Sequence, residues 1–215
     1  TTIAASCTDE VEYALEGSVF VAGAAIQWLR DGLQLFAKAS ETEALASQVS
    51  DTGGVYFVPA FVGLGAPYWD PYARGAIFGI TRGTTKNHII RATIESMAYQ
   101  TADVIDVMRK EAGVALTSLR VDGGASANNL LLQFQADIMN TPIIRPKCIE
   151  TTALGTANLA ALAVGCYDSL DKITEHWQID RRFAPQMDDL TRDEKMKEWH
   201  KAIRNSSGWA QRDLI

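Results

Sequence analysis

The stretch from Ser118 to Met139 constrains the fold of this chain more than any other part of its sequence. A short apolar strand, residues 118–121, leads into Asp-Gly-Gly at 122–124 and then into a helix that we expect to begin with Ser126 as its N-cap. Glycines let the backbone approach a ligand and a helix N-terminus attracts phosphate, so this order is typical of nucleotide-binding α/β proteins. A simple tight turn is the alternative, because neither GxxxxGK[ST] nor GxGxxG is present.

The rest of the chain continues this alternation of strands and helices. Short apolar runs bounded by turn residues predict strands, and apolar residues at helical spacing predict helices. We expect Asn87 to cap the longest helix and Gly113 to end it. The sequence therefore predicts an α/β fold. The expected strands are 11–15, 55–61, 75–80, 118–121 and 142–145, and the expected helices are 18–36, 41–49, 88–111, 126–139, 152–164, 168–177 and 191–212.

Two glycine–amide pairs strengthen the prediction of a nucleotide site. Gly23 and Gln27 are one helical turn apart, and Gly124 and Asn128 have the same spacing, so in each pair an amide would stand above a glycine on one helix face. An amide donates and accepts hydrogen bonds, so it could read a purine edge or a ribose hydroxyl. Alternatively, Gln27 and Asn128 are exposed helix polar residues without a ligand.

Groups for acid–base chemistry are scarce in this sequence. Asp70, Asp122 and Glu150 are candidate carboxylates beside loops, but they form no visible pair, and Asp70 and Asp122 could simply hold their own turns. Asp70 belongs to a stiff loop, residues 63–72, that is rich in glycine, proline and aromatic residues. A kinase needs a carboxylate beside the acceptor hydroxyl and ligands for Mg²⁺, and neither is evident here.

Composition and charge exclude several other classes of function. The chain is 47% hydrophobic and 21% charged, as expected for a globular protein, and its net charge of -6 does not favour binding to nucleic acid or an anionic membrane. No apolar run reaches the roughly 18 residues of a membrane helix.

The sequence lacks a starting Met, so we expect it to be part of a longer protein. Three cysteines without CxxC spacing indicate a reduced, cytoplasmic protein without structural zinc, and these are Cys7, Cys148 and Cys166.

The sequence also resembles a known family, the FGGY carbohydrate kinases. GAIFGI at 75–80, followed after seven residues by HIIRATIE at 88–95, matches the second signature of that family. Three further segments resemble the members that phosphorylate glycerol, and the similarity runs from about Val11 to about Pro185. These segments are YALEGSVFVAGAAIQWLRD, PAFVGLGAPYWDPYARGAIFGITRG and RVDGGASANN.

The resemblance implies an actin-like ATPase fold, of the ribonuclease H-like type, with a central sheet flanked by helices. Residues 1–215 would form the carboxy-terminal, nucleotide-side domain, and the amino-terminal domain would be absent from this chain. Members of the family transfer the γ-phosphoryl group of ATP, with Mg²⁺, to a polyol or sugar, and the resemblance implies that the acceptor is glycerol. Four residues match family nucleotide contacts, namely Gly23, Gln27, Gly124 and Asn128.

The resemblance also implies what this chain lacks. The family's phosphate loop, its acceptor-binding Arg-Glu pair and its catalytic Asp have no counterpart here, so we expect no catalytic and no metal-binding residue in this chain and no activity from it alone. The full protein is expected to be a homo-oligomer. Two alternatives are a kinase of the same family for another polyol or sugar, and a non-catalytic actin-like module that binds nucleotide.

Overall fold

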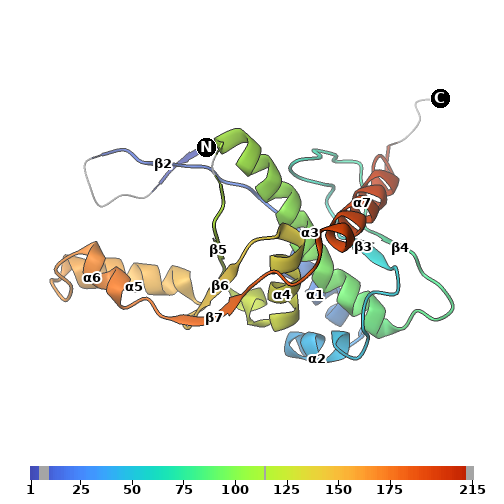
Figure 1. Ribbon diagram of the computed structural model, residues 1–215, viewed down its shortest axis with the longest axis horizontal. Coiled ribbons are helices and arrows are strands. Elements are labelled where there is room, and N and C mark those ends of the chain that lie inside the picture. Colours follow the sequence, from blue (N-terminus) through green and yellow to red (C-terminus); the bar gives the residue numbers. More distant parts are fainter. Residues whose placement is uncertain (5–9, 114, 212–215) are drawn as a thin grey trace.

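The computed structural model describes residues 1–4, 10–113 and 115–211, so Cys7 and Arg212, the expected end of the last helix, lie outside the described residues (Figure 1). The architecture is α/β, as predicted. The α-helices are α1 (Gly23–Asp31), α2 (Thr42–Ala46), α3 (Lys86–Ala112), α4 (Asn129–Met139), α5 (Thr151–Ala163), α6 (Leu170–Glu175) and α7 (Asp189–Ser206). The strands are β1 (Thr2–Ile3), β2 (Tyr13–Ala14), β3 (Tyr56–Val58), β4 (Ala76–Phe78), β5 (Leu119–Arg120), β6 (Ile143–Pro146) and β7 (Ile179–Phe183).

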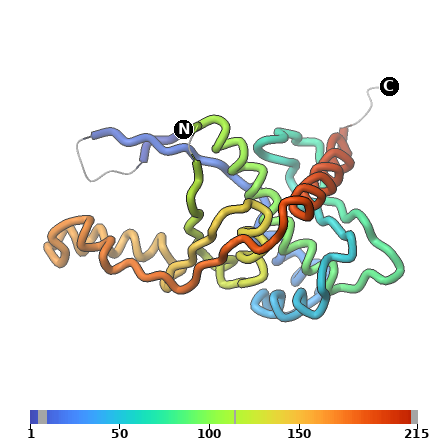
Figure 2. The backbone as a smooth tube through the Cα atoms, in the orientation of Figure 1, coloured from blue at the N-terminus to red at the C-terminus, as the bar shows by residue number. Residues whose placement is uncertain are grey.

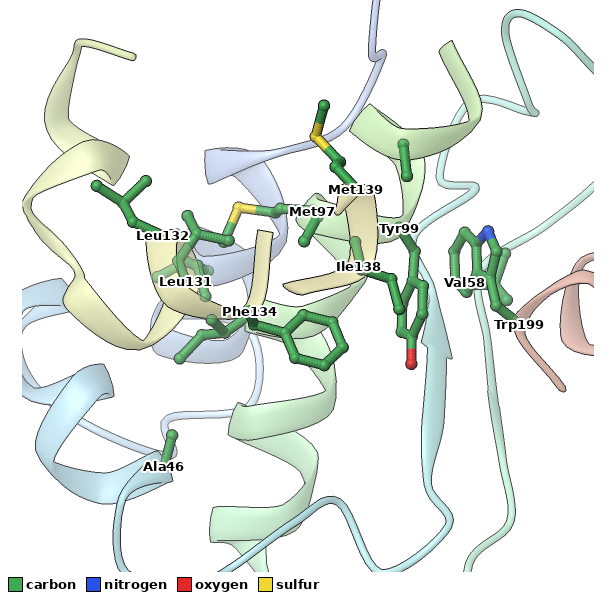
Figure 3. Close-up of a cluster of buried hydrophobic side chains, with 14 of the residues drawn as sticks. Ala46, Val58, Met97, Tyr99, Leu131, Leu132, Phe134, Ile138, Met139 and Trp199 are labelled. Atoms are coloured by element: carbon green, nitrogen blue, oxygen red, sulfur yellow. The ribbon is translucent and has the colours of Figure 1, made fainter. Parts of the chain in front are cut away.

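Helix α3 forms the centre of the main hydrophobic core. Its inner face buries side chains such as Met97 and Tyr99, and α4 packs beside it, with the Phe134 ring against Tyr99 (Figure 3). Gly113 ends the helix in the left-handed conformation, at φ 62°, as predicted. The prediction of its start was wrong, because Thr85 and not Asn87 is the N-cap; the Thr85 backbone N–H donates to His88 Nδ1 at 3.1 Å, as in a capping box.

The largest sheet among the described residues has the order β5–β6–β7 and lies beside α4 (Figure 1). Strands β5 and β6 are parallel, with Leu119 opposite Ile143, and β7 runs antiparallel to β6. The sequence analysis missed β7. Its sequence IDRRF shows no apolar alternation, because it is an edge strand that buries only Phe183.

Helix α1 is shorter than the expected helix 18–36. It begins at Gly23 and ends at Asp31, so Phe36 is buried from the segment that follows rather than from the helix. Gln34 has a φ of 54°, which no α-helix accommodates. The apolar spacing continued past the helix because both segments pack on the same core.

Helix α5 is rich in alanine and leucine and has no distinct polar face, yet none of its residues is buried. It extends away from the body of the molecule together with α6, below the β1–β2 hairpin (Figures 1 and 2). Helices whose apolar residues are spread over all faces are normally covered by other parts of a protein. The described residues therefore leave α5 without the cover that its composition calls for.

Candidate functional site

The four predicted site residues surround one cavity of about 400 Å³. Gly23 and Gln27 come from α1, whereas Gly124 and Asn128 come from the turn between β5 and α4. The cavity is large enough for much of a nucleotide. The other residues that line it are Ile26, Arg30, Ala39, Ser40, Thr42, Glu43, Ile94, Met97, Ala125, Ala127 and Leu131.

The two glycines of the β5–α4 turn have different roles. Gly123 has a φ of 74°, a conformation that favours glycine, whereas Gly124 is the first residue of a 3₁₀ turn, Gly124–Ala127, and has no positive φ. A Cβ added at Gly124 would meet no protein atom within 4 Å, and the same holds for Gly23. Gly123 therefore shapes the turn, while Gly23 and Gly124 leave open space at the cavity.

Asn128 lines the cavity, but not from the helix face on which it was predicted to lie. Ser126 is not the N-cap, because residues 124–127 form the 3₁₀ turn and Asn128 itself caps α4, its Oδ1 accepting from the Leu131 backbone N–H at 3.0 Å. Gly124 and Asn128 therefore do not share an α-helical face. Gln27 does lie one turn after Gly23 on α1 and is exposed, as expected.

Glu43 supports this site, and the sequence analysis missed it. Its carboxylate accepts from both the backbone N–H and the Nδ2 of Asn129, at 2.9 and 3.0 Å. These contacts fix the first turn of α4 against α2, and the Asn128 Nδ2 lies 3.5 Å from the buried Thr42 Oγ1. No local pattern could have identified Glu43, because its partner lies 86 residues later in the chain.

Asp70 holds backbone segments together and does not line the cavity. Its oxygens accept from the N–H groups of Tyr72, Ala73 and Gly208 at 2.8 to 3.0 Å. Partial desolvation alone would raise the pKa of Asp70, but these three donors outweigh it and lower the pKa below its usual value. The structure therefore supports the turn-holding interpretation of Asp70.

Asp122 and Glu150, the other two candidate carboxylates, are exposed and lie outside the cavity lining. Within the described ranges, no group of three or more His, Cys, Asp or Glu residues could hold a metal ion. Cys148 and Cys166 are exposed free thiols. No helix of residues 1–4, 10–113 and 115–211 is long and apolar enough to cross a membrane.

A buried carboxylate, Asp103 on α3, joins three elements outside the cavity. It accepts from Tyr68 Oη and Trp199 Nε1, both at 2.7 Å, and contacts His200 Nε2 at 2.8 Å. The hydrogen bond to Asp103 raises the pKa of His200, and burial, then the Asp103 charge, raises that of Tyr68. This cluster, which the sequence analysis missed, fastens α7 and the 63–72 loop to α3.

Comparison with known proteins gives a consistent result. Residues 2–164 match the model of the "FGGY family of carbohydrate kinases, C-terminal domain". The chain is 62% identical over 200 residues to a glycerol kinase of Pseudothermotoga lettingae, covering 93% of this chain and 40% of the relative. It is 59% identical over 211 residues to one of Lachnoclostridium phytofermentans, covering 98% and 42%.

Solved structures agree with these relatives. The Plasmodium falciparum glycerol kinase with ADP superposes with a TM-score of 0.84 at 40% identity, covering 93% of this chain and 40% of that one. A ligand-bound xylulose kinase of Lactobacillus acidophilus gives a TM-score of 0.68 at 26% identity, covering 85% and 37%. The chain therefore spans about two fifths of the length of these proteins.

FGGY kinases have an actin-like ATPase fold, which confirms the predicted fold class. The chain belongs to the FGGY family of carbohydrate kinases and corresponds to its C-terminal domain.

Proposed function

We propose that this chain is the carboxy-terminal, ATP-binding part of a glycerol kinase, which transfers the γ-phosphoryl group of MgATP to glycerol and gives sn-glycerol 3-phosphate. The observation that carries the proposal is the convergence of Gly23, Gln27, Gly124 and Asn128 on one cavity. Gly23 and Gly124 leave room that a side chain would fill, and Gln27 and Asn128 supply amides.

In this proposal the adenosine of ATP occupies the cavity. Ile94, Met97 and Leu131 offer apolar surface to a base, and Gly23 and Gly124 let a ligand approach the backbone. The amide of Gln27 is exposed and available to a ligand. Asn128 Oδ1 is occupied by the cap of α4, so its Nδ2 is the group that would donate to the nucleotide.

The acceptor site and the catalytic carboxylate belong, in this proposal, to an amino-terminal domain outside this chain. Two observations support such a domain: the chain spans 40% of its relative from P. lettingae, and α5 is apolar but uncovered. The single carboxylate of the cavity lining, Glu43, is engaged by Asn129. The residues that line the cavity therefore do not fit a magnesium site, so Mg²⁺ would be held by ATP and the other domain.

The sequence identities favour glycerol over a sugar as the phosphoryl acceptor. Eight relatives described as glycerol kinases are 56–62% identical to this chain, whereas the structural neighbours from L. acidophilus, a xylulose kinase and a gluconate kinase, are 26% identical. A coupled assay of the full-length protein with glycerol, xylulose and gluconate decides between them. If the protein phosphorylates a sugar much faster than glycerol, that sugar and not glycerol is the substrate. If it phosphorylates none of the three, the non-catalytic module is favoured. Cytoplasmic location and homo-oligomerisation stay predictions.

The nucleotide site is tested with Gly124→Val in the full-length protein. The variant should fold, because a Cβ added at Gly124 meets no protein atom within 4 Å and its φ is not positive. It should lower the affinity for ATP by roughly tenfold or more, as overpacking of a site typically does. Gly83→Val is the matched control, since Gly83 is exposed and its added Cβ meets only Thr81 Oγ1 at 3.8 Å. Wild-type ATP affinity in folded Gly124→Val would refute the site.

A further inference from the structure

The turn that carries Gly124 and Asn128 is fixed by a side chain from the neighbouring sheet. Arg145, on β6, donates from one Nη to the carbonyl oxygens of Ser126 at 2.8 Å and Ala127 at 3.3 Å. Its Nε and other Nη both contact Asp180 Oδ2 on β7 at 2.7 Å. The Arg145 side chain is only 12% exposed, and its hydrogen bond to the Ser126 carbonyl is partly buried, whereas Asp180 is 44% exposed.

Arg145 acts on the turn from outside the cavity, because it is not one of the lining residues whereas Ala127 is. The carbonyls of Ser126 and Ala127 are thus engaged by a cation on a side where no ligand is expected. Residues 124–127 are a short 3₁₀ turn followed by the extended Asn128, so few backbone bonds of their own hold them. The charge-assisted hydrogen bonds from Arg145 to the two carbonyls therefore contribute much of what fixes this turn.

Two further contacts hold the segment that follows. Arg181, opposite Arg145 in the β6–β7 register, donates to Asn129 Oδ1 at 3.4 Å, and Glu43 accepts from the other side of Asn129. The start of α4 is thereby held between α2 and the β6–β7 pair. Strand β7, which sequence patterns did not reveal, supplies both Asp180 and Arg181.

We propose that Arg145 is a positioning residue for the nucleotide, which fixes the turn so that Gly124 and Asn128 face the ligand at the right place. This inference rests on the proposed nucleotide site. Asp180 neutralises the guanidinium, so the role of Arg145 is geometric and not a long-range attraction of phosphate. A lysine keeps the charge but cannot span two carbonyls and a carboxylate in one plane, so Arg145→Lys removes the geometry alone.

The test uses the full-length protein with Arg145→Lys and with Arg192→Lys as the matched control. Arg192 on α7 is also paired, with Asp189 at 2.7 Å, and its side chain is 18% exposed, but it has no contact with the turn. The measurements are equilibrium binding of a non-hydrolysable ATP analogue, the KM for ATP, the KM for glycerol, kcat and the thermal unfolding midpoint.

We expect Arg145→Lys to weaken analogue binding and raise the KM for ATP by roughly tenfold, the effect typical of losing hydrogen bonds to a charged group. The KM for glycerol and kcat should stay within about twofold, and Arg192→Lys should match the wild type in all of them. A merely structural role for Arg145 would lower the unfolding midpoint and leave the analogue affinity of the folded protein unchanged.

The outcomes separate this inference from the proposed function. If the wild type does not bind the analogue, the nucleotide site fails, and the role of Arg145 fails with it. If Asn128→Ser weakens binding but folded Arg145→Lys does not, or if both KM values rise equally, the role of Arg145 alone is refuted. Should Arg145→Lys not fold, Asp180→Asn decides, because that carboxylate is 44% exposed: a twofold to threefold loss of affinity supports the role, and no loss refutes it.

Discussion

Two replacements of Asn128 separate the observed cap of α4 from the proposed contact with the nucleotide. Asn128→Ala removes the acceptor for the Leu131 N–H, which is 3.0 Å from Oδ1, and also removes Nδ2. Loss of an N-cap typically costs about 1 kcal/mol, which lowers the unfolding midpoint of a domain of this size by about 2–4 °C. Loss of one neutral hydrogen bond to a ligand, about 0.5–1.5 kcal/mol, raises the KM for ATP by roughly twofold to twelvefold.

Asn128→Ser is the matched variant. Serine caps helices about as well as asparagine, so α4 keeps its cap, but the shorter side chain loses the amide N–H that would reach the nucleotide. We therefore expect Asn128→Ser to raise the KM for ATP as much as Asn128→Ala does, with an unfolding midpoint close to the wild type. The KM for glycerol should change little in either variant.

The assay is steady-state kinetics of the full-length protein with ATP and glycerol varied separately, together with thermal unfolding. A wild-type KM for ATP in Asn128→Ser, with lower stability only in Asn128→Ala, would show that Asn128 is a cap and nothing more. Equal rises in both KM values would point instead to a displaced domain.

The remaining predictions concern stability, association and activity. Asp103→Ala should lower the free energy of unfolding by about 3 kcal/mol, measured with urea, because it leaves buried donors without an acceptor. Because Asp103 raises the pKa of His200, the stabilisation by His200 should be complete below its unfolded pKa of about 6.5 and be lost as pH rises through the higher folded pKa. Urea midpoints of wild type and His200→Gln should therefore converge at alkaline pH, and a difference that grows with pH would contradict this. The 215-residue chain alone should form no glycerol 3-phosphate in a coupled assay; product formation that a mutation in this chain abolishes would overturn that prediction. The chain alone should also self-associate through the strongly exposed Trp69 and Trp209, and Trp209→Ser should lower its sedimentation coefficient.

Much of the local structure was predictable because it depends on residues that are close in sequence. The apolar spacing of α3 and the glycine that ends it lie within one segment, and Gly23 and Gln27 share a face of α1 because they are one turn apart. The family signature is likewise a local pattern. These features give the α/β class, the family and the four residues that the structure gathers at one cavity.

Other features depend on contacts between distant segments, and no local pattern contains them. Strand β7 exists because its backbone pairs with β6, although three of its five residues are charged. Asp103 meets Trp199 across 96 residues, and Asp70 meets Gly208 across 138.

The site shows the same division. The sequence identified the Gly-Gly pair, but only the tertiary structure decided that Gly123 carries the positive φ and that Gly124 faces open space. The tertiary structure likewise decided that Asn128 is a cap, that Arg145 fixes the turn before it, and that Glu43 holds the first turn of α4. A turn has too few hydrogen bonds of its own to choose among conformations, so the surfaces that pack around it make that choice.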